Sequence, residues 1–412
     1  MRIVPGHSRE SGPARALIAS RIYAPEPGAA PLRLAALHRA LDRVGLVTDV
    51  LTSTPGHHAP ASTAGLDPFP GRMRRWPVIR NTDGYLRGYL GYLSFDIPLF
   101  FRLLASRRPA VLVVEPPPTT GLVGLIGARL RRVPFVYYAP DIWSVASQSA
   151  GSPAWVTQAL RAMETMVWRQ ADAILTVFPE LAARITEAAP TAHVHVVGHG
   201  ADLQTFTPEG PTQILDHPYL VYAGTASEVH GARIFMEALP QVLTQVPHAR
   251  VVVIGHGEER PVMERLARKL PPGTVTFLPR LSPQETAAWI RGSRATLASV
   301  RPGPYGFALA TKVYASVGCG VPVVYVGEGE GDDLVSGHDL GWVAPYQTAA
   351  TATQMVTALT TEISQPRREQ LRAWAQTSGS LDAAADRGAE VITHLLAPGA
   401  TPGVRPSEGR HQ

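Results

Sequence analysis

Short apolar runs of strand length alternate with amphipathic stretches along most of the chain. The stretches between the runs repeat apolar residues three or four positions apart, which is the spacing of one helix face. In the first half the pattern predicts strands over residues 15–23, 47–52, 111–115, 135–138, 173–177 and 194–197, and helices over residues 32–44, 90–105, 121–130, 155–169 and 180–188. Strands that alternate with helices are typical of a doubly wound α/β fold with a parallel sheet.

The same alternation starts again after a polar, proline-bearing stretch at residues 207–218. The second half predicts strands over residues 219–222, 250–254, 275–277, 295–298 and 322–326, and helices over residues 231–246, 258–269, 283–291 and 312–317. Two α/β units of similar size imply a cleft between them. Parallel sheets bind ligands beyond the carboxyl ends of their strands, so we expect the binding site there.

The composition describes a globular chain and excludes a disordered or fibrous one. Its 412 residues are 45% hydrophobic and 17% charged, enough for two or three hydrophobic cores. Cys319 is the only cysteine, which excludes a disulfide framework and a cysteine-based metal site. No apolar run reaches the roughly 18 residues that span a bilayer, and the opening lacks the apolar core of a signal peptide. We therefore expect a cytoplasmic protein.

The charge balance points to an anionic partner. The net charge is +5 without a dense basic block or a nucleic-acid-binding motif, so an anionic substrate or membrane surface is expected rather than nucleic acid. Of the 38 basic residues only Lys269 and Lys312 are lysines. Lys312 follows Thr311 at the start of a predicted helix, where the helix dipole disfavours a cation. An anion bound at the same place would explain it; an ordinary surface lysine is the alternative.

Two strand-to-helix turns are rich in small residues. The first runs from Tyr23 through Gly28, and the second from Tyr222 through Gly224, Thr225 and His230 to Gly231. Small residues there let a phosphate or sugar approach backbone N–H groups and the positive helix end. A tight turn or a capped helix without ligand is the alternative. No GxGxxG or Walker pattern follows, so a nicotinamide cofactor or ATP is not indicated.

Polar side chains follow two other predicted strands. Asp141-Ile-Trp143 places a carboxylate and an aromatic face after residues 135–138, and His199-Gly-Ala-Asp202 follows residues 194–197. Asp141 suits an acid near a sugar or its hydroxyls, and a helix N-cap is the alternative. Residues 84–108 interleave aromatic, aliphatic and basic residues, so this helix either packs on its own sheet or lies in a membrane interface.

The order of these landmarks resembles the family-4 retaining glycosyltransferases of GT-B fold, and most of all the bacterial cell-surface branch that includes O-antigen N-acetylaminosugar transferases. The likeness covers residues 15–396. It rests on the Gly28 loop with Arg33, on Asp141-Ile-Trp143, on His199-Gly-Ala-Asp202 with Phe206 and Pro208, on Thr311-Lys-Val-Tyr314 followed by Gly318-Cys-Gly-Val-Pro-Val-Val324, and on the loop at residues 327–335.

The resemblance implies two facing Rossmann-like domains with parallel sheets. A disordered tail (1–14) is expected before an acceptor-side domain (15–206), a linker (207–218) and a nucleotide-sugar domain (219–380). A helix at 381–397 is expected to pack back on the N-terminal domain before a second disordered tail (398–412). The implied donor site consists of Gly224, Thr225, His230, Arg280, Arg301 and Lys312 on the diphosphate, Gly327, Glu328 and Glu330 near the donor, and Gly28, Arg33 and Asp141 toward the donor sugar and acceptor.

Several positions depart from the family pattern. The acidic residue that holds the nucleotide ribose would fall at Ala315, and the usual diphosphate-binding Arg and Lys would fall near Thr225 and His230. His199 replaces the Asn of the linker signature. Either Lys312, Arg280 and Arg301 supply the charge, or catalytic competence is reduced. No metal is expected, because the adjacent Asp332-Asp333 pair suits a helix cap better than a metal site.

The expected activity is retaining transfer of a sugar from a UDP- or GDP-sugar, with Asp141, His230 and Lys312 as the catalytic residues. The acceptor is either a polyprenol-linked sugar, with peripheral contact at the inner face of the membrane, or a small natural-product intermediate. The alternative to an enzyme is a degenerate GT-B protein that binds a nucleotide sugar or glycan without turnover. A sugar epimerase is disfavoured, because we see no clear pair of carboxylates for proton abstraction.

Overall fold

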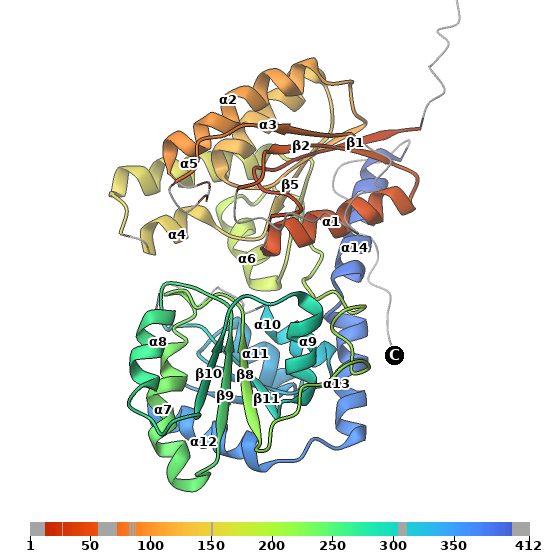
Figure 1. Cartoon of the computed structure of the whole chain (residues 1–412). Coiled ribbons are helices and arrows are strands. Elements are labelled where there is room, and N and C mark those ends of the chain that lie inside the picture. Colours follow the sequence, from red (N-terminus) through yellow and green to blue (C-terminus); the bar gives the residue numbers. More distant parts are fainter. Residues whose placement is uncertain are drawn as a thin grey trace, which may run out of the picture. The chain divides into compact units, whose positions relative to one another are not determined.

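The chain forms two parallel β-sheets, each in its own unit, in the computed structural model (Figure 1). The structure describes residues 13–26, 28–56, 72–81, 84, 86, 88–149, 151–303 and 311–397. Unit 1 comprises residues 1–144, 153–197 and 385–412, and unit 2 comprises residues 145–152 and 198–384. The tail expected at 398–412 and nearly all of the tail expected at 1–14 lie outside the described residues.

Unit 1 contains a seven-stranded parallel sheet in the order β3-β2-β1-β4-β5-β6-β7. The strand order reverses between β1 and β4, and right-handed crossovers therefore place helices on both faces. Its elements are β1 (Arg15–Ala19), α1 (Ala29–Arg43), β2 (Val47–Ser53), β3 (Met73–Trp76), α2 (Tyr89–Ala105), β4 (Val111–Val114), α3 (Pro118–Arg131), β5 (Phe135–Ala139), α5 (Ala154–Gln170), β6 (Ala173–Thr176), α6 (Pro179–Ala188) and β7 (Val194–Val196). The short helix α4 (Trp143–Ser149) follows β5.

Unit 2 contains a six-stranded parallel sheet in the order β10-β9-β8-β11-β12-β13. Here the order reverses between β8 and β11, which marks the point where such sheets bind ligands. Its elements are β8 (Tyr219–Ala223), α7 (Arg233–Gln245), β9 (Arg250–Ile254), α8 (Arg260–Ala267), β10 (Val275–Leu278), α9 (Pro283–Gly292), β11 (Ala295–Ser299), α10 (Lys312–Gly318), β12 (Val323–Val326), α11 (Glu330–Gly337), β13 (Gly341–Ala344), α12 (Thr348–Thr360) and α13 (Gln365–Ser378). The last helix, α14 (Leu381–Leu396), starts in unit 2 and continues in unit 1.

Helices cover both faces of the central strands, so the apolar runs of the sequence become fully buried strands. All residues of β4, β11 and β12 are buried. On α3, glycine allows the helix backbone to approach the sheet closely. A Cβ added at Gly124 would lie 2.6 Å from Cγ2 of Val114 on β4.

The end of α14 belongs to unit 1. The guanidinium Nε of Arg387 donates a hydrogen bond to the carbonyl oxygen of Val197 at 2.8 Å. A Cβ added at Gly388 would lie 3.3 Å from Leu37 and 3.4 Å from Leu175, so the helix backbone packs directly on α1 and β6. Residues Leu381 to Ala384, at the start of α14, remain part of unit 2.

The predicted α/β architecture and most predicted elements are confirmed, with corrections at the ends. The first strand ends at Ala19 rather than at residue 23, because the Ser20 hydroxyl bonds to the Ile22 carbonyl oxygen and turns the chain. The first helix begins at Ala29 rather than near residue 32. Asp332 and Asp333 do not cap α11, since Gly329 occupies the N-cap position. The prediction missed β3, α4, β13, α12 and α13.

Candidate functional site

The loop that follows β8 forms the centre of the candidate site in unit 2. Tyr222 is fully buried near the end of β8, and its hydroxyl donates to the carbonyl oxygen of Thr225 at 2.9 Å. Gly224 has a φ of +129°, which few side chains tolerate. Gly255, at the end of β9, lies so close that an added Cβ would be 2.3 Å from the Gly224 carbonyl oxygen. The loop is therefore held by tight backbone packing rather than by large side chains.

Lys312 extends from the first residue of α10 toward this loop. Its ammonium Nζ donates to the Tyr222 hydroxyl at 3.0 Å and lies 4.3 Å from the centre of that ring. Its Cε is 3.5 Å from the position of a Cβ on Gly224. Burial lowers the pKa of Lys312 from its ordinary value of 10.5 to about 7. No carboxylate in the described parts of the chain forms an ion pair with Nζ, so an anionic ligand would supply the missing negative charge.

His230 lies at the end of the same loop and is neutral at neutral pH. The positive charge of Lys312, together with burial, lowers the pKa of His230 to about 3. Its Nδ1 hydrogen-bonds with the Ser227 hydroxyl at 2.7 Å, and its carbonyl oxygen accepts from the Ser299 hydroxyl at 2.6 Å. The backbone of His230 is thus attached to the end of β11. Its side chain is a neutral hydrogen-bonding group and not a cation.

Arg301 lies against the same end of the loop as His230. Its backbone N–H donates to the Val229 carbonyl oxygen at 2.9 Å, and its guanidinium pairs with Glu228 at 3.2 Å. The side chain covers Gly231, where an added Cβ would lie 2.2 Å from Cγ of Arg301. The predicted residues Gly224, Thr225, His230, Arg301 and Lys312 are therefore brought together in one cluster.

The other predicted donor residues lie on neighbouring strand ends. Gly327 directly follows β12, has a φ of +150°, and would place a Cβ 2.5 Å from the Val300 carbonyl oxygen. Glu328 is exposed, and Glu330 opens α11. Arg280 is exposed after β10, which is separated from β8 by β9 and is therefore about 10 Å away across the sheet. The structure does not bring Arg280 into the Lys312 cluster.

In unit 1, Arg33 forms a buried ion pair with Glu115. Both side chains are almost fully buried, and the Ser20 hydroxyl also donates to Glu115, at 3.2 Å. Burial acts to lower the pKa of Arg33, but Glu115 together with Tyr138 and Asp141 outweighs this effect, and the pKa is raised. The Arg33 guanidinium supplies the cation that a carboxylate buried at the end of β4 requires. The expected position of Arg33 near a sugar stays a prediction.

Asp141 lies beside this pair, two residues beyond the end of β5, and its side chain is exposed. It does not cap α4. The carboxylate of Glu164 on α5 takes that role and accepts hydrogen bonds from the backbone N–H groups of Trp143 at 2.5 Å and Ser144 at 3.1 Å. The alternative that Asp141 caps a helix is therefore wrong, and its contact with a sugar stays a prediction. Gly28, the N-cap of α1 with a φ of +140°, is exposed in the same unit.

Two residues of these sites were missed by the sequence reading. Tyr222, the partner of Lys312, was read only as a strand residue. Arg21 is buried after β1, with its guanidinium 4.0 Å from the centre of the Tyr92 ring and 5.4 Å from that of Trp143. An arginine soon after an apolar strand could have indicated a functional residue at the strand end, but its stacking partners, Tyr92 and Trp143, are distant in sequence.

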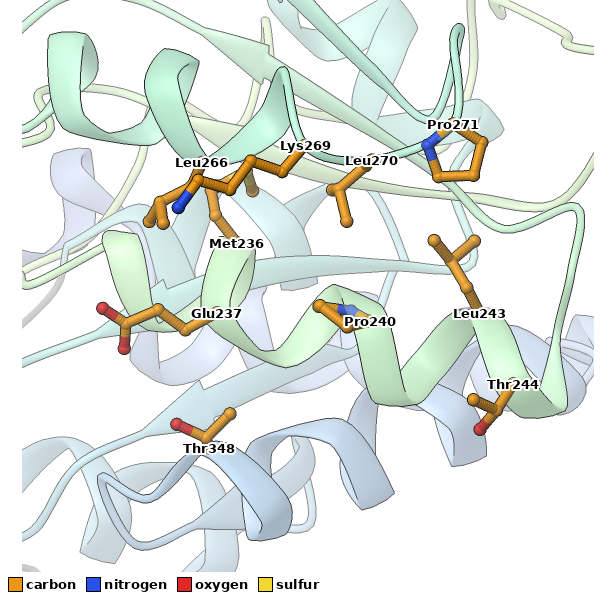
Figure 2. A pocket seen from close by; sticks show the side chains of 10 residues that line it. All are labelled: Met236, Glu237, Pro240, Leu243, Thr244, Leu266, Lys269, Leu270, Pro271 and Thr348. Carbon is orange, nitrogen blue, oxygen red and sulfur yellow. The ribbon is translucent and has the colours of Figure 1, made fainter.

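A groove of about 680 Å³ in unit 2 lies away from these strand ends (Figure 2). Figure 2 shows the side chains of Met236, Pro240 and Leu243 on α7 facing those of Leu266 and Leu270. The groove runs along α7 and α8, and none of Gly224, His230 and Lys312 lines it. We therefore do not consider the groove part of the candidate site. Within the described residues, no group of three or more His, Cys, Asp or Glu side chains could hold a metal ion.

Comparisons with known proteins agree with this fold. Residues 28–200 match the model of the glycosyl transferase 4-like domain, and residues 217–361 match that of glycosyl transferases group 1. Among solved structures, sucrose-phosphate synthase from Thermosynechococcus elongatus has a TM-score of 0.70 at 16% identity, covering 93% of this chain and 99% of that one. HepE from Anabaena in complex with UDP-glucose has a TM-score of 0.69 at 17% identity, covering 92% and 99%.

The glycosyltransferase WaaG, involved in lipopolysaccharide biosynthesis, has a TM-score of 0.68 at 14% identity, with 92% of this chain and 99% of that one covered. No curated protein sequence matches significantly. The two family models lie on the two sheets just described, and the structural matches extend over both units. The chain is a group 1, GT4-like glycosyltransferase of GT-B fold.

Proposed function

We propose that this glycosyltransferase takes its sugar from a UDP-sugar and that the Lys312 cluster binds the donor diphosphate. The observation that carries the proposal is the Lys312 ammonium, held on the Tyr222 ring and hydroxyl beside Gly224 at the point where the sheet order reverses. HepE, which shares the fold, has been seen with UDP-glucose and with UDP, and this favours uridine over guanosine.

The chemistry requires positive charge at this place. Transfer with retention passes through an oxocarbenium-like state in which the departing diphosphate gains negative charge. A preorganised ammonium and backbone N–H groups stabilise that charge more than they stabilise the ground state. Lys312 supplies the ammonium, the open backbone at Gly224 allows close approach, and neutral His230 offers a hydrogen bond. Arg301 adds charge where the usual Arg and Lys of the family are absent.

We propose that the acceptor hydroxyl or the donor sugar meets unit 1 at Asp141, with Gly28 leaving room for it. The resemblance to aminosugar transferases of the cell surface favours a polyprenol-linked sugar as the acceptor over a small natural-product intermediate. Ala315, in place of the acidic ribose-binding residue, requires that the ribose be held by other groups, and Glu330, at the start of α11, is our candidate.

A thermal-shift titration with UDP and GDP, followed by turnover with a panel of UDP-, GDP- and dTDP-sugars, tests the donor. Lys312→Met should abolish the shift caused by UDP and lower transfer about 10²-fold or more. Lys269→Met is the matched control, since it removes the only other lysine, which lies in the groove of Figure 2. A larger shift with GDP would overturn the choice of uridine, and a shift without turnover would favour the degenerate binding protein.

A further inference from the structure

The outward face of α2 is apolar along its whole length. Its exposed large side chains are Tyr89, Leu90, Leu93, Ile97, Phe101 and Leu104. Placed at about 100° per residue, these positions fall within an arc of about 120° on the helix. The exposed fractions of Leu90, Ile97 and Phe101 are 73%, 57% and 62%, so the described parts of the chain leave these side chains largely uncovered.

The opposite face of the same helix is buried, which makes α2 apolar on both sides. Phe95, Leu99 and Leu103 pack inward. The two charged residues of the helix do not reach the outward face: Asp96 is buried and accepts from Thr119 and Thr120, and Arg102 is partly buried. A surface helix ordinarily turns a polar face to water, and a continuous exposed apolar patch marks an interaction site.

Neighbouring elements carry further exposed apolar side chains beside α2. Trp76 at the end of β3 is 40% exposed, and the Arg102 guanidinium lies 5.9 Å from the centre of its ring. Ile79 is 58% exposed and is held to α2 by a hydrogen bond from its backbone N–H to the Ser94 hydroxyl at 2.9 Å. α3 packs beside α2, as Figure 1 shows. We use "the α2 surface" for the six side chains of α2 together with Trp76 and Ile79.

Arginines are frequent in the segments that flank the α2 surface. Residues 72–132 contain 11 arginines and three acids, of which Asp96 and Glu115 are buried and Asp83 lies outside the described residues, and Arg80 pairs with Glu26. Four arginines gather where α2 ends: Arg131 donates to the Ser106 hydroxyl at 2.9 Å, Arg108 donates to the Arg132 carbonyl oxygen at 2.7 Å, and Arg107 is exposed. Cations are favoured near the carboxyl end of a helix, but four arginines are more than the helix dipole alone explains.

We propose that the α2 surface docks the protein on an anionic phospholipid bilayer. An apolar helix face enters the boundary between headgroups and acyl chains, and flanking arginines bind anionic headgroups. A second copy of the chain fits less well, because a two-fold interface would place the arginines of both copies against each other. No helix among the described residues is long and apolar enough to cross a membrane, so the contact would be peripheral. This proposal does not rest on the identity of the sugar donor.

Co-sedimentation with vesicles tests it, using phosphatidylcholine alone and phosphatidylcholine mixed with phosphatidylglycerol. The protein should bind the mixed vesicles and not the neutral ones, and binding should fall as salt is added. Ile97→Glu with Phe101→Glu should weaken binding about 10-fold or more, because two apolar anchors become charged. Ile214→Glu is the matched control: Ile214 is 83% exposed in unit 2 and its replacement should change nothing.

A second pair of variants separates charge from apolar contact. Arg107→Gln with Arg108→Gln should weaken binding about five-fold for each arginine, whereas Arg265→Gln with Arg268→Gln on α8 and its end should not. Thermal unfolding and the shift caused by UDP should be unchanged in all variants, which keeps this test distinct from that of the donor site. Absence of binding to mixed vesicles, or equal loss in the control variants, would overturn the proposal. The proposal would also be overturned if the natural protein formed a dimer and Ile97→Glu dissociated it.

Discussion

The titration of Lys312 offers a sharp test of the donor site. Burial lowers the pKa of Lys312 to about 7. The groups beside it do not titrate in the same range: the pKa of His230 is lowered to about 3, and burial raises the pKa of Tyr222 far above neutrality. The terminal phosphate of UDP has a pKa of about 6, so above pH 7 it is already ionised. Between pH 7 and pH 9, Lys312 is therefore the group whose charge controls binding.

The magnitude follows from the protonated fraction of Lys312. With a pKa of about 7, roughly one half of the free protein carries the ammonium at pH 7, about one part in eleven at pH 8 and about one in a hundred at pH 9. If UDP binds the charged form, its Kd should rise about five-fold from pH 7 to pH 8 and about nine-fold more by pH 9. Lys312→Met should bind roughly 10- to 100-fold more weakly at pH 7, and its Kd should not depend on pH in this range.

Isothermal titration calorimetry in two buffers of different ionisation enthalpy measures both the Kd and the protons taken up. The natural protein should take up about half a proton at pH 7 and about 0.9 at pH 8. Lys269→Met should behave like the natural protein, because Lys269 is an exposed residue beyond α8. A Kd that stays constant from pH 7 to pH 9, or a pH dependence that survives in Lys312→Met, would refute the reasoning.

Three further predictions concern stability. Because the pKa of Lys312 is lower in the folded than in the unfolded protein, its ammonium destabilises the folded state fully below about pH 7 and less and less as the pH rises toward 10.5. In urea denaturation, Lys312→Met should therefore be more stable than the natural protein at pH 6, and the difference in the free energy of unfolding should shrink toward pH 9. Glu115→Gln leaves Arg33 buried without its charged partner and should lower the free energy of unfolding by about 3–5 kcal/mol, whereas changing both residues to Met should recover most of the loss. Gly124→Ala would place a Cβ 2.6 Å from Val114 and should cost about 1–3 kcal/mol in the same assay, whereas a Tm equal to that of the natural protein would contradict the packing.

The fold was predictable because most strands are continuous apolar runs. β4 and β12 are buried on both faces, and their sequences show it directly. β3 was missed for the opposite reason. It is a short edge strand, Met73–Trp76, with two arginines, and only its pairing with β2, such as Val50 opposite Met73, makes it a strand. Such pairing depends on residues far apart along the chain.

The candidate site was only partly predictable, because its partners are distant in sequence. The position of Lys312 and the glycine at 224 were readable, but the contact with Tyr222, 90 residues away, was not. Arg33 appeared to be available for a ligand, and Glu115, 82 residues away, already neutralises it. The sequence of residues 84–108 showed an apolar helix, but only the structure shows which side the sheet covers and which side stays exposed.

The choice of lysine at position 312 gains a reason from these contacts. In a chain with 36 arginines among 38 basic residues, an arginine would be the expected cation. An arginine cannot lose its proton in a protein, so in the empty site it would remain as a partly buried charge beside the Tyr222 ring. A lysine with a pKa near 7 can stay largely neutral above that pH until a diphosphate arrives, and then takes up the proton that the ligand stabilises. The same property favours release, because the ammonium that holds the product is destabilised as soon as the product begins to leave.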